Sequence, residues 1–437
     1  MKKILLVGSG AREVAIARKI KTSRHSSILF CVSPTINPHI SSLCQEYFCI
    51  SLSNNKEIVG IAKKFGVDFV VVGPENPLEN GLVDDIEKEG IPCVAPKKTV
   101  ARIETSKSFA RKVLDGCYKE KNPKRKEFKS VDKVQSFLKE LHENYVIKHD
   151  GLMGGKGVKI SGEHLHSTED ALDFCKEIIN NKGSFLIEEK LIGEEFSLMS
   201  FCDGVSCVHM PAVQDHKRAF EGDVGPNTGG MGTYSFENHS LPFLFKEEVL
   251  DAQKTNELVL KELKTITGEE FRGVLYGGFM ATKDGVRVIE YNARFGDPEA
   301  MNVLALLKTD FIDVCEHIIN RSLNLLSVEF EKAATVCKYV VPVGYPDSPE
   351  KNFKISCKNA DDQRLFFASV KEEGGEVFAT GSRTAAYIGK ETTIEGAEKV
   401  AEEGVRGVSG KLFHRKDIGT KNLIQKRMDN MKKVRCS

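Results

Sequence analysis

The sequence predicts a multidomain chain of the α/β and α+β classes, with an N-terminal doubly wound parallel α/β domain, a larger central unit and a small C-terminal α+β domain. Its 437 residues suffice for about three domains, and 41% hydrophobic residues suffice to give each domain a core. Short apolar runs alternate with helical sequence near the N-terminus, and several β-like runs precede a helix beyond about residue 330.

The first domain is predicted over residues 1–102. An apolar run at residues 4–7 enters Gly8-Ser9-Gly10, and apolar residues then recur at helical spacing. Further apolar runs lie at residues 28–32, 69–72 and 91–94, with helical or turn sequence between them. A parallel sheet covered on both faces requires this alternation.

The central unit is predicted as two subdomains, residues 103–190 and 191–328. We expect a helix at residues 106–114 and strands at 145–148, 184–188, 197–201 and 286–291. The charged stretch at residues 119–126 contains both lysine and glutamate, which favours a solvated linker over a basic binding patch. The last domain, residues 329–437, is predicted from β-like runs at 334–343, 377–380 and 385–388 and a helix at 394–405.

Composition excludes several classes of function. Lysine plus arginine number 63 and aspartate plus glutamate 62, so no overall charge would hold the chain on nucleic acid or a membrane. The twelve cysteines lack paired metal spacing, which is typical of reduced cytosolic thiols. No apolar segment approaches the ~20 residues that cross a bilayer, and the N-terminal run suits a buried strand better than a secretory signal. We therefore expect a cytoplasmic protein.

The glycine turn after the first apolar run is a candidate phosphate site. Backbone N–H groups at a helix N-terminus bind phosphate, and the Arg12 guanidinium adds donors. A dinucleotide fingerprint would need glycine where Glu13 stands and an acid where Val32-Ser33-Pro34 ends the second strand. An NAD-dependent oxidoreductase is therefore disfavoured, whereas glycines kept only for tight strand–helix packing remain an alternative.

A second glycine-rich segment joins two lysines. Lys148 ends a predicted strand, and the loop at residues 151–157 carries four glycines and Lys156. Glycines let a backbone close over an anion and lysine supplies charge, although Gly157 stands where a Walker A loop needs serine or threonine. We interpret the segment as a phosphate-binding lid, with a plain mobile surface loop as the alternative.

A third segment predicts a metal site. Residues two apart on a strand face the same side, so Glu290 and Asn292 would present two oxygen ligands together, and Arg294 would add charge beside them. Such a pair suits a hard cation such as Mg²⁺. The alternative is a strand end with a solvated polar face.

A fourth segment, residues 214–235, is rich in glycine and polar residues and is predicted to be a loop ordered by binding. A plain surface excursion is the alternative. His216 lies between Asp215 and Lys217, and we prefer a positioning role for it over general base catalysis because no nucleophile accompanies it.

Seven segments, taken in order, resemble the phosphoribosylamine-glycine ligase family. Asp-His-Lys-Arg, Gly-Pro-Asn-Thr-Gly-Gly-Met-Gly and Asn-x-Arg-Phe-Gly-Asp-Pro-Glu are close to specific for that family. The segments are residues 8–13, 73–75, 106–107, 148–157, 188–189, 215–235 and 290–299. The resemblance implies an ATP-grasp fold, Mg²⁺ or Mn²⁺ as cofactor, and ATP, glycine and 5-phosphoribosylamine as the only partners. We expect a monomer.

The resemblance also implies roles for single residues. ATP would be bound by Lys107, Lys148, Gly154, Gly155, Lys156, Gly157, Glu188, Glu189, Leu191 and Glu195. The metal would be bound by Glu290 and Asn292. The acyl-transfer centre would be surrounded by Arg294, Asp215, Lys217, Arg218, Asp297, Thr228 and Gly229. Lys148 would act in catalysis by neutralising charge on the transferred phosphoryl group. The amine would be held by Gly10, Arg12, Glu13, Pro74 and Glu75.

The sequence departs from the family pattern at Ala11 and Val14, where the family usually has glycine and histidine. These departures concern the amine site and not the ATP chemistry. Two alternatives of other kinds are another ATP-grasp enzyme, such as a biotin-dependent carboxylase, and a non-catalytic nucleotide-binding regulator. The loops at residues 215–218 and 227–232 argue against the first, and the presence of Glu290, Asn292 and Arg294 argues against the second.

Overall fold

The computed structural model describes residues 1–153 and 157–437. Its N-terminal sheet has the order β3-β2-β1-β4-β5, and every neighbouring pair is parallel. The strand order reverses at β1, so the turn after β1 opens into the crevice where such sheets bind ligands. The strands are β1 Lys2–Val7, β2 Ser27–Ser33, β3 Glu46–Cys49, β4 Phe69–Val72 and β5 Cys93–Val94. The helices are α1 Ala11–Lys21, α2 Pro38–Ser41, α3 Asn55–Phe65, α4 Glu75–Glu79, α5 Leu82–Lys88 and α6 Lys98–Thr105.

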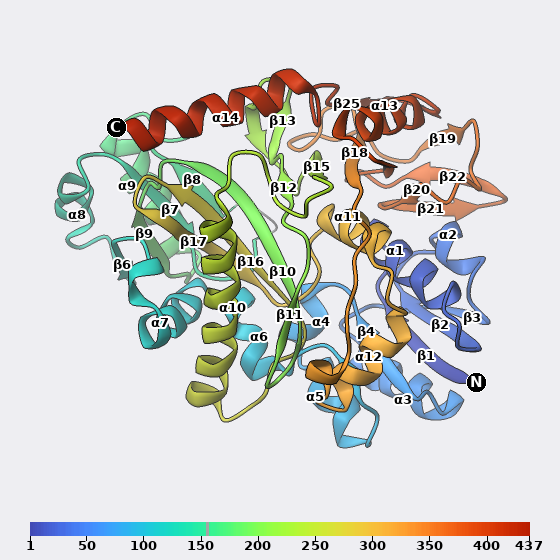
Figure 1. The fold of residues 1–437 in the computed structure, drawn as a ribbon. Coiled ribbons are helices and arrows are strands. Elements are labelled where there is room, and N and C mark those ends of the chain that lie inside the picture. The colour runs from blue at the N-terminus through green and yellow to red at the C-terminus, as the bar shows by residue number, and fades with distance from the viewer. Residues whose placement is uncertain (154–156) are drawn as a thin grey trace.

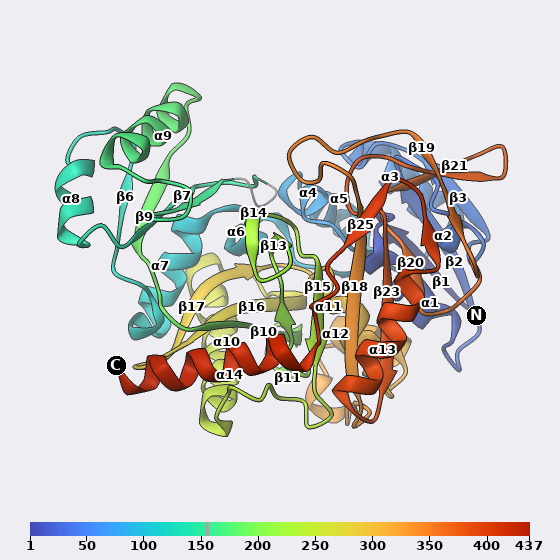
Figure 2. The same ribbon diagram turned by 90° about the horizontal axis from the view of Figure 1, so that it is seen from above.

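A second, antiparallel sheet has the order β6-β9-β7-β8 and an apolar core of its own. We call it, with α8 and α9, the small subdomain; Figure 2 shows it standing apart from the rest of the molecule. The strands are β6 Arg125–Phe128, β7 Tyr145–His149, β8 Val158–Ile160 and β9 Phe185–Glu189. The helices are α7 Lys107–Cys117, η1 Lys119–Lys121, α8 Val134–Glu140 and α9 Thr168–Asn180.

The prediction of a solvated linker at residues 119–126 is wrong. The segment contains η1 and the start of β6, which pairs with β9. Lys121 is buried against Asp251, and Arg125 pairs with Asp115. The charges of this stretch therefore dock it onto the protein, because each of these two cations has an acid from another segment as its partner.

The rest of the central unit is built on an antiparallel sheet of order β11-β10-β16-β17. Its strands are β10 Glu194–Asp203, β11 Cys207–His209, β16 Arg272–Thr282 and β17 Gly285–Asn292. Between them lie β12 Gln214–Asp215, β13 Arg218–Phe220, β14 Val224–Asn227 and β15 Gly232–Ser235. The helices are α10 Lys246–Thr267, α11 Glu299–Leu306, α12 Phe311–Ile319 and η2 Leu323–Leu325.

The C-terminal domain completes a sheet that the central unit begins. β15 pairs with β18, and the sheet runs β12-β15-β18-β23-β20, with β25 also paired to β18. A smaller sheet has the order β21-β22-β19-β24. The strands are β18 Ala334–Pro342, β19 Phe353–Cys357, β20 Leu365–Phe367, β21 Val370–Glu373, β22 Glu376–Ala379, β23 Ala385–Glu391, β24 Val408–Ser409 and β25 Leu412–His414. The helices are α13 Ile394–Val405 and α14 Lys421–Cys436.

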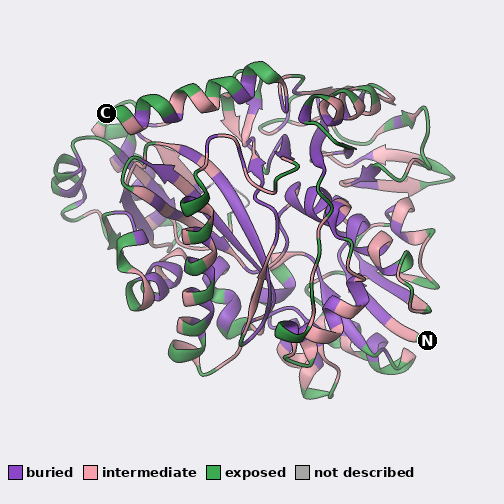
Figure 3. Cartoon of the chain, viewed as in Figure 1, coloured by how far each residue is buried: buried purple, intermediate pink, exposed green. Residues whose placement is uncertain are grey.

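The last helix, α14, leaves the C-terminal domain and crosses the central unit (Figure 1), where it packs against β10 and β16. β18 is buried along its whole length, whereas the outer faces of α10 and α14 are exposed (Figure 3). Among the described residues, no helix combines the length and apolar character needed to span a membrane. The predicted α/β and α+β multidomain fold is confirmed.

Candidate active site

A cavity of about 920 Å³ lies where the domains meet. The N-terminal domain contributes Arg12 and Glu75, the small subdomain Lys148, and the C-terminal segments Arg383 and Arg427. Further parts of the wall come from α6, α7, β9, β10, β16, β17 and the loop that contains β12 to β14. Charged side chains of both signs face the cavity from most of these parts, so the cavity suits a polar, charged ligand.

A β-bulge in β17 turns two oxygen ligands toward the cavity. Gly278 pairs with Glu290 and Phe279 with Val288, which leaves Ile289 without a paired residue. Val288 is buried, as is Tyr291, so the extra residue moves Glu290 and Asn292 to the face opposite Tyr291. Without the bulge, Glu290 would share the buried face of Val288, because side chains two apart on a strand point the same way.

Two cations hold the bulge in place. The Arg111 Nη1 and Nη2 atoms donate to the carbonyls of Val288 (2.9 Å) and Ile289 (2.7 Å), and Lys148 Nζ donates to Ile289 (3.1 Å). Glu188 receives Arg111 through both carboxylate oxygens (2.6 and 2.8 Å) and lies 2.7 Å from Lys148 Nζ. Burial raises the pKa of Glu188, but Arg111 and Lys148 outweigh it and hold that pKa at about 2. Glu188 therefore remains ionised between its two partners.

Lys107 begins α7 and reaches the glycine-rich loop. Its Nζ donates to the Gly151 carbonyl at 2.9 Å, and Asp150 accepts from the Ser108 amide at 3.2 Å. Burial lowers the pKa of Lys107 and of Lys148. Two partly dehydrated ammonium groups thus face one side of the cavity from α7 and β7.

Glu290 lies under a strong positive field. Lys217 is the main cause, Lys148 and Lys107 add to it, and the pKa of Glu290 falls to about 2 although burial opposes this. Lys217 Nζ lies 3.5 Å from Glu290 and 3.4 Å from Glu195, and its own pKa is raised, mainly by Glu195. Glu290 is an ionised oxygen donor at neutral pH, as a ligand for a hard divalent cation must be.

Arg294 follows β17 and joins it to the N-terminal domain. It pairs with Glu104 at 2.8 Å and with Glu75 at 3.4 Å, and Glu104 also accepts from the Ala293 amide at 2.7 Å. Burial alone would lower the pKa of Arg294, but Glu104 and Glu75 raise it. The pKa of Glu75 falls to about 2 against its burial because of Arg294 and Arg12.

Asp215, which is partly buried, and Glu299, which is buried, form an acidic pair beside this group. Burial raises the pKa of Asp215 and of Glu299, and the charge of Glu299 raises the pKa of Asp215 further. Tyr276 donates to Glu299 at 2.9 Å. Gly230, with φ of +111°, allows this packing because an added Cβ would lie 2.7 Å from an Asp215 oxygen and 2.7 Å from Pro298.

The C-terminal domain supports the glycine-rich substrate-side loop. Arg383 donates to the carbonyls of Gly229 (2.6 Å) and Asp297 (2.7 Å) and stacks over Tyr339. The Tyr339 hydroxyl donates to the Asp297 carboxylate at 2.5 Å. Thr228 donates from its hydroxyl and its amide to the Lys217 carbonyl (2.9 and 2.7 Å), which fixes the loop against the segment that carries Lys217.

His216 is buried and neutral. Burial, together with Arg427 and Arg415, lowers its pKa to about 3. Its Nδ1 lies 3.1 Å from the Gly232 carbonyl, so it ties the two sides of the loop together. A histidine of this kind is a weak base at neutral pH, which agrees with a positioning role.

The N-terminal turn lies partly behind the cavity wall. Glu13 accepts from the Gly10 amide (2.5 Å) and from Arg12 Nε (2.6 Å), so it braces the turn from inside. Arg12 reaches the Phe295 carbonyl at 3.1 Å and lines the cavity. Gly10, Glu13 and Pro74 are not among its lining residues, and their contact with a substrate stays a prediction.

The structure brings most of the predicted side chains to one cavity. Gly154, Gly155 and Lys156 lie outside the described residues. The other predicted residues that line the cavity are Lys107, Lys148, Gly157, Glu188, Glu189, Leu191, Glu195, Asp215, Lys217, Arg218, Thr228, Gly229, Glu290, Asn292, Arg294, Asp297, Arg12 and Glu75. Arg218 pairs with Glu163 of the small subdomain and donates to Gly225, which places it at the rim.

Sequence reasoning missed several cavity residues, among them Glu104, Arg111, Arg383 and Arg427. For Arg111 a signal existed, because it lies four residues after Lys107 on one helix face. The others come from segments that carry no local motif, so only tertiary structure reveals them.

Comparison with known proteins accounts for this arrangement. Models of the phosphoribosylglycinamide synthetase family match the N domain over residues 2–104, the ATP-grasp (A) domain over residues 105–300 and the C domain over residues 335–421. Phosphoribosylamine–glycine ligases are 45% identical in Methanosarcina barkeri, over 99% of this chain and all of the relative, and 45% identical in Methanocaldococcus jannaschii, over the same shares.

Solved structures agree with the sequence comparison. A crystal structure of a phosphoribosylamine–glycine ligase from Thermotoga maritima has a TM-score of 0.81 at 26% identity and covers 95% of this chain and 99% of its own. An N5-carboxyaminoimidazole ribonucleotide synthetase from the same organism, with a TM-score of 0.64 at 15% identity, covers 95% of this chain and all of its own and shares the fold.

Proposed function

We propose a mechanism from the premise that this chain belongs to the phosphoribosylglycinamide synthetase family. The protein is an ATP-dependent ligase that joins glycine to 5-phosphoribosylamine and forms glycinamide ribonucleotide in purine biosynthesis. We infer that the reaction passes through glycyl phosphate. A carboxylate is a poor acyl donor, so glycine needs activation by the γ-phosphate before an amine can attack it.

Lys107 and Lys148 would hold the phosphates of ATP, since they face the cavity from two elements next to the glycine-rich loop. Glu189 and Leu191 would line the adenine edge and Glu195 the ribose. Both oxygens of Glu188 are taken by Arg111 and Lys148, so we assign it to positioning Lys148 and the bulge instead of to adenine. The predicted roles of Gly154, Gly155 and Lys156 concern residues outside the described range.

The ATP-grasp family implies a divalent cation, and the donors present fit one. Glu290 is ionised, lies on the cavity face with Asn292, and both offer the oxygen atoms that Mg²⁺ or Mn²⁺ prefers. When bound, such a cation neutralises charge on the phosphates during transfer. We propose Mg²⁺ at Glu290 and Asn292.

Arg294, Lys217 and Lys148 would stabilise the negative charge that develops as the glycine carboxylate oxygen attacks the γ-phosphorus and ADP leaves. Asp215, Asp297, Thr228 and Gly229 shape the wall where glycine would lie. The amine nitrogen then attacks the acyl carbon, the carbon–oxygen bond to phosphate breaks, and the amine gives up a proton as the amide forms.

The amine would enter from the N-terminal domain. Arg12 and Glu75 lie there beside Arg294 and face the same cavity. Gly10, Glu13 and Pro74 support this side by shaping the turn and the start of α4. Ala11 and Val14, where the sequence departs from the family pattern, are fully buried, so they contribute to packing and not to the cavity surface.

The observation that carries this mechanism is the convergence of Lys107, Lys148, Glu290, Asn292 and Arg294 on one cavity at the domain junction. These residues belong to α7, to β7, and to β17 with the segment that follows it, and these three parts are far apart in the chain. Phosphoryl transfer requires this combination of cations and oxygen ligands around one point.

The test is ADP formation by the purified protein with magnesium, ATP and glycine, with and without phosphoribosylamine generated in the assay. We expect ADP only with both co-substrates, a product with the mass of glycinamide ribonucleotide, and loss of most turnover in Glu290→Gln. ATP consumption with a different acid or amine would overturn the substrate assignment. Near-normal activity of Glu290→Gln would overturn the metal assignment.

A further inference from the structure

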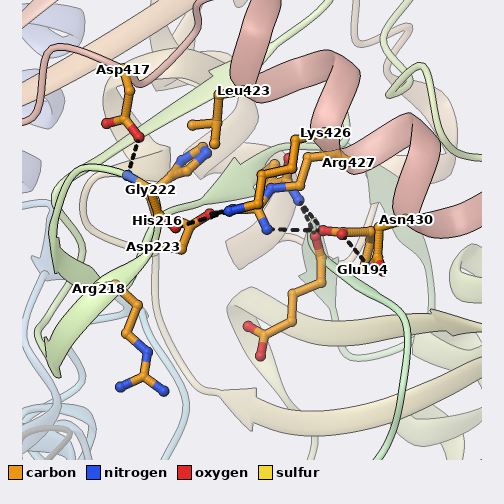
Figure 4. A network of polar contacts seen from close by, with 12 residues as sticks. Glu194, His216, Arg218, Gly222, Asp223, Asp417, Leu423, Lys426, Arg427 and Asn430 are labelled. Carbon is orange, nitrogen blue, oxygen red and sulfur yellow. Dashed lines mark hydrogen bonds and ion pairs between the residues drawn. The ribbon is translucent and has the colours of Figure 1, made fainter.

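The last helix, α14, contributes one charged side chain to the cavity wall, Arg427. Its Nη2 lies 2.6 Å from Asp223 Oδ2 and its Nη1 lies 3.3 Å from Glu194 Oε2 (Figure 4). Asp223 lies in the turn between β13 and β14, and Glu194 is the first residue of β10. One guanidinium therefore joins two segments that are distant in the sequence.

Both partners of Arg427 are held from other sides as well. Asn430, one turn further along α14, donates to Glu194 Oε1 at 2.7 Å. Arg415 lies 3.0 Å from Asp223 Oδ1. Asp417 accepts from the Gly222 amide at 2.9 Å (Figure 4). The turn and the start of β10 are thus docked on the C-terminal segment through charged groups.

The charges of this cluster depend on Arg427. Burial would raise the pKa of Asp223, but Arg427 and other cations lower it. Burial raises the pKa of Glu194, and Arg427 counteracts that effect. A planar guanidinium can serve two carboxylates at once, which a single ammonium group does less well.

Two groups that face the proposed nucleotide and metal belong to the same segments as these two carboxylates. Glu195 follows Glu194 on β10, and Lys217 precedes the β13–β14 hairpin that carries Asp223. Lys217 Nζ lies 3.4 Å from Glu195 and 3.5 Å from Glu290. The separation of the two segments joined by Arg427 therefore sets where Lys217 lies between Glu195 and Glu290.

We infer that Arg427 is a positioning residue for the ligase reaction: by joining Glu194 to Asp223, it fixes Lys217 against Glu195 and Glu290 and so completes the nucleotide side of the active site from the C-terminal helix. This inference depends on the proposed function only for the identity of the reaction that Arg427 supports. The structural part of the inference is that α14 positions the wall that would contact a nucleotide. It applies to any nucleotide bound in this cavity.

The test compares Arg427→Met with Arg435→Met on the same helix. Arg435 pairs with Glu248 and stacks on Phe245, and it does not line the cavity. Arg427→Met removes the ion pairs to Asp223 and Glu194, and Arg435→Met removes the ion pair to Glu248, so we expect both variants to lower the melting temperature. Only Arg427→Met should raise the KM for ATP and lower kcat/KM, by about 10- to 100-fold, the range typical when a residue that orients a ligand is removed.

Calorimetric titration with MgADP provides a readout that needs no turnover. We expect weaker binding in Arg427→Met and unchanged binding in Arg435→Met. Wild-type protein that binds MgADP but ligates nothing would contradict the proposed function and leave this comparison intact. Equal loss of stability in the two variants, with unchanged KM, kcat and MgADP affinity in both, would overturn the inference.

Arg427→Met could fail to fold, because it leaves the buried Glu194 and the partly buried Asp223 with less compensating charge, so a second variant is needed. Arg427→Gln combined with Asp223→Asn keeps hydrogen-bonding groups at both positions while removing that excess charge. It should fold and still bind MgADP about 10-fold more weakly or worse. Wild-type affinity in this folded double variant would also overturn the inference.

Discussion

At the scale of single residues, burial and pairing decide what each charged side chain can do. The motif that contains Glu188 predicts an adenine contact, whereas the structure places the carboxylate between Arg111 and Lys148. Glu290 was expected from the sequence as a metal ligand, and it lies on the cavity face with a pKa of about 2. Local sequence identifies such residues by type, but their partners come from segments far away in the chain.

The ion pairs of Glu188 with Arg111 and Lys148 make the free energy of unfolding depend on pH in the acid range. Its folded pKa of about 2 lies below the usual 4.5, so its contribution is complete above pH 4.5 and is lost as the pH falls toward 2. That contribution is on the order of 3 kcal/mol. Glu188→Gln should lower the free energy of unfolding at neutral pH by about 3–5 kcal/mol, because Arg111 and Lys148 remain buried without an acid.

Urea unfolding across this pH range measures the effect. The Glu188→Gln profile should be flatter than that of the wild type between about pH 4.5 and about pH 2. The exposed Glu403 provides the control, and Glu403→Gln should follow the wild-type profile. Parallel profiles for Glu188→Gln and the wild type would show that the ionised carboxylate does not stabilise the fold.

At the scale of secondary-structure elements, several buried strands were predicted from the sequence, whereas others and the bulge in β17 were not. Apolar runs predicted β1, β4, β7 and β18, since buried strands of this length carry continuous β-branched residues. The edge strand β3 and the strand β6 were missed, because polar edge strands lack that pattern. The bulge depends on the pairing with β16 and on Arg111, neither of which is local.

Gly278 tests the importance of the bulge. An added Cβ would lie 3.2 Å from Glu290 Cγ, so Gly278→Ala should push Glu290 away from its position. We expect kcat/KM to fall by about 10-fold or more, with a higher metal requirement and a smaller effect on stability. Titration of the ATP-dependent activity with metal measures kcat/KM and the metal requirement. Thermal unfolding measures the change in stability.

Gly60 is the matched control for that substitution. It lies in α3, and an added Cβ there would have no heavy atom within 4 Å apart from its chain neighbours and the backbone of its own helix. Gly60→Ala should stabilise the protein by about 0.5–1 kcal/mol and leave the kinetics unchanged, because alanine is the better helix former. Equal kinetic constants for Gly278→Ala and Gly60→Ala would show that activity does not require the space that Gly278 leaves beside Glu290.

At the scale of the whole molecule, the cavity exists only where all parts of the chain meet. The C-terminal domain supplies Arg383, and α14 supplies Arg427. The C-terminal domain also supplies β18, which pairs with β15 over four residues from Gly232 to Ser235. The division at residues 102, 190 and 328 stays a prediction, and the shared sheet shows that the central and C-terminal parts depend on each other.

A chain of residues 1–330 should therefore not fold as a soluble unit. Removing β18 would expose the fully buried β15 as an open edge, and exposed strand edges promote aggregation. We expect aggregates in size-exclusion chromatography and loss of native circular dichroism. The full-length protein treated in parallel is the control, and a monomeric truncated chain that still binds MgADP would contradict the prediction.

Local sequence patterns were sufficient to predict the fold class, the family and the types of residue that the chemistry needs. Those features depend on local patterns, namely apolar periodicity, glycine turns and motifs such as the one from Glu290 to Glu299. Three features became visible only in the tertiary structure: the bulge turns Glu290 toward the cavity, Arg111 binds Glu188 through both carboxylate oxygens, and α14 contributes to the cavity wall. The physical reason is that burial and charge pairing depend on which distant segments come into contact, and a local sequence pattern does not predict those contacts.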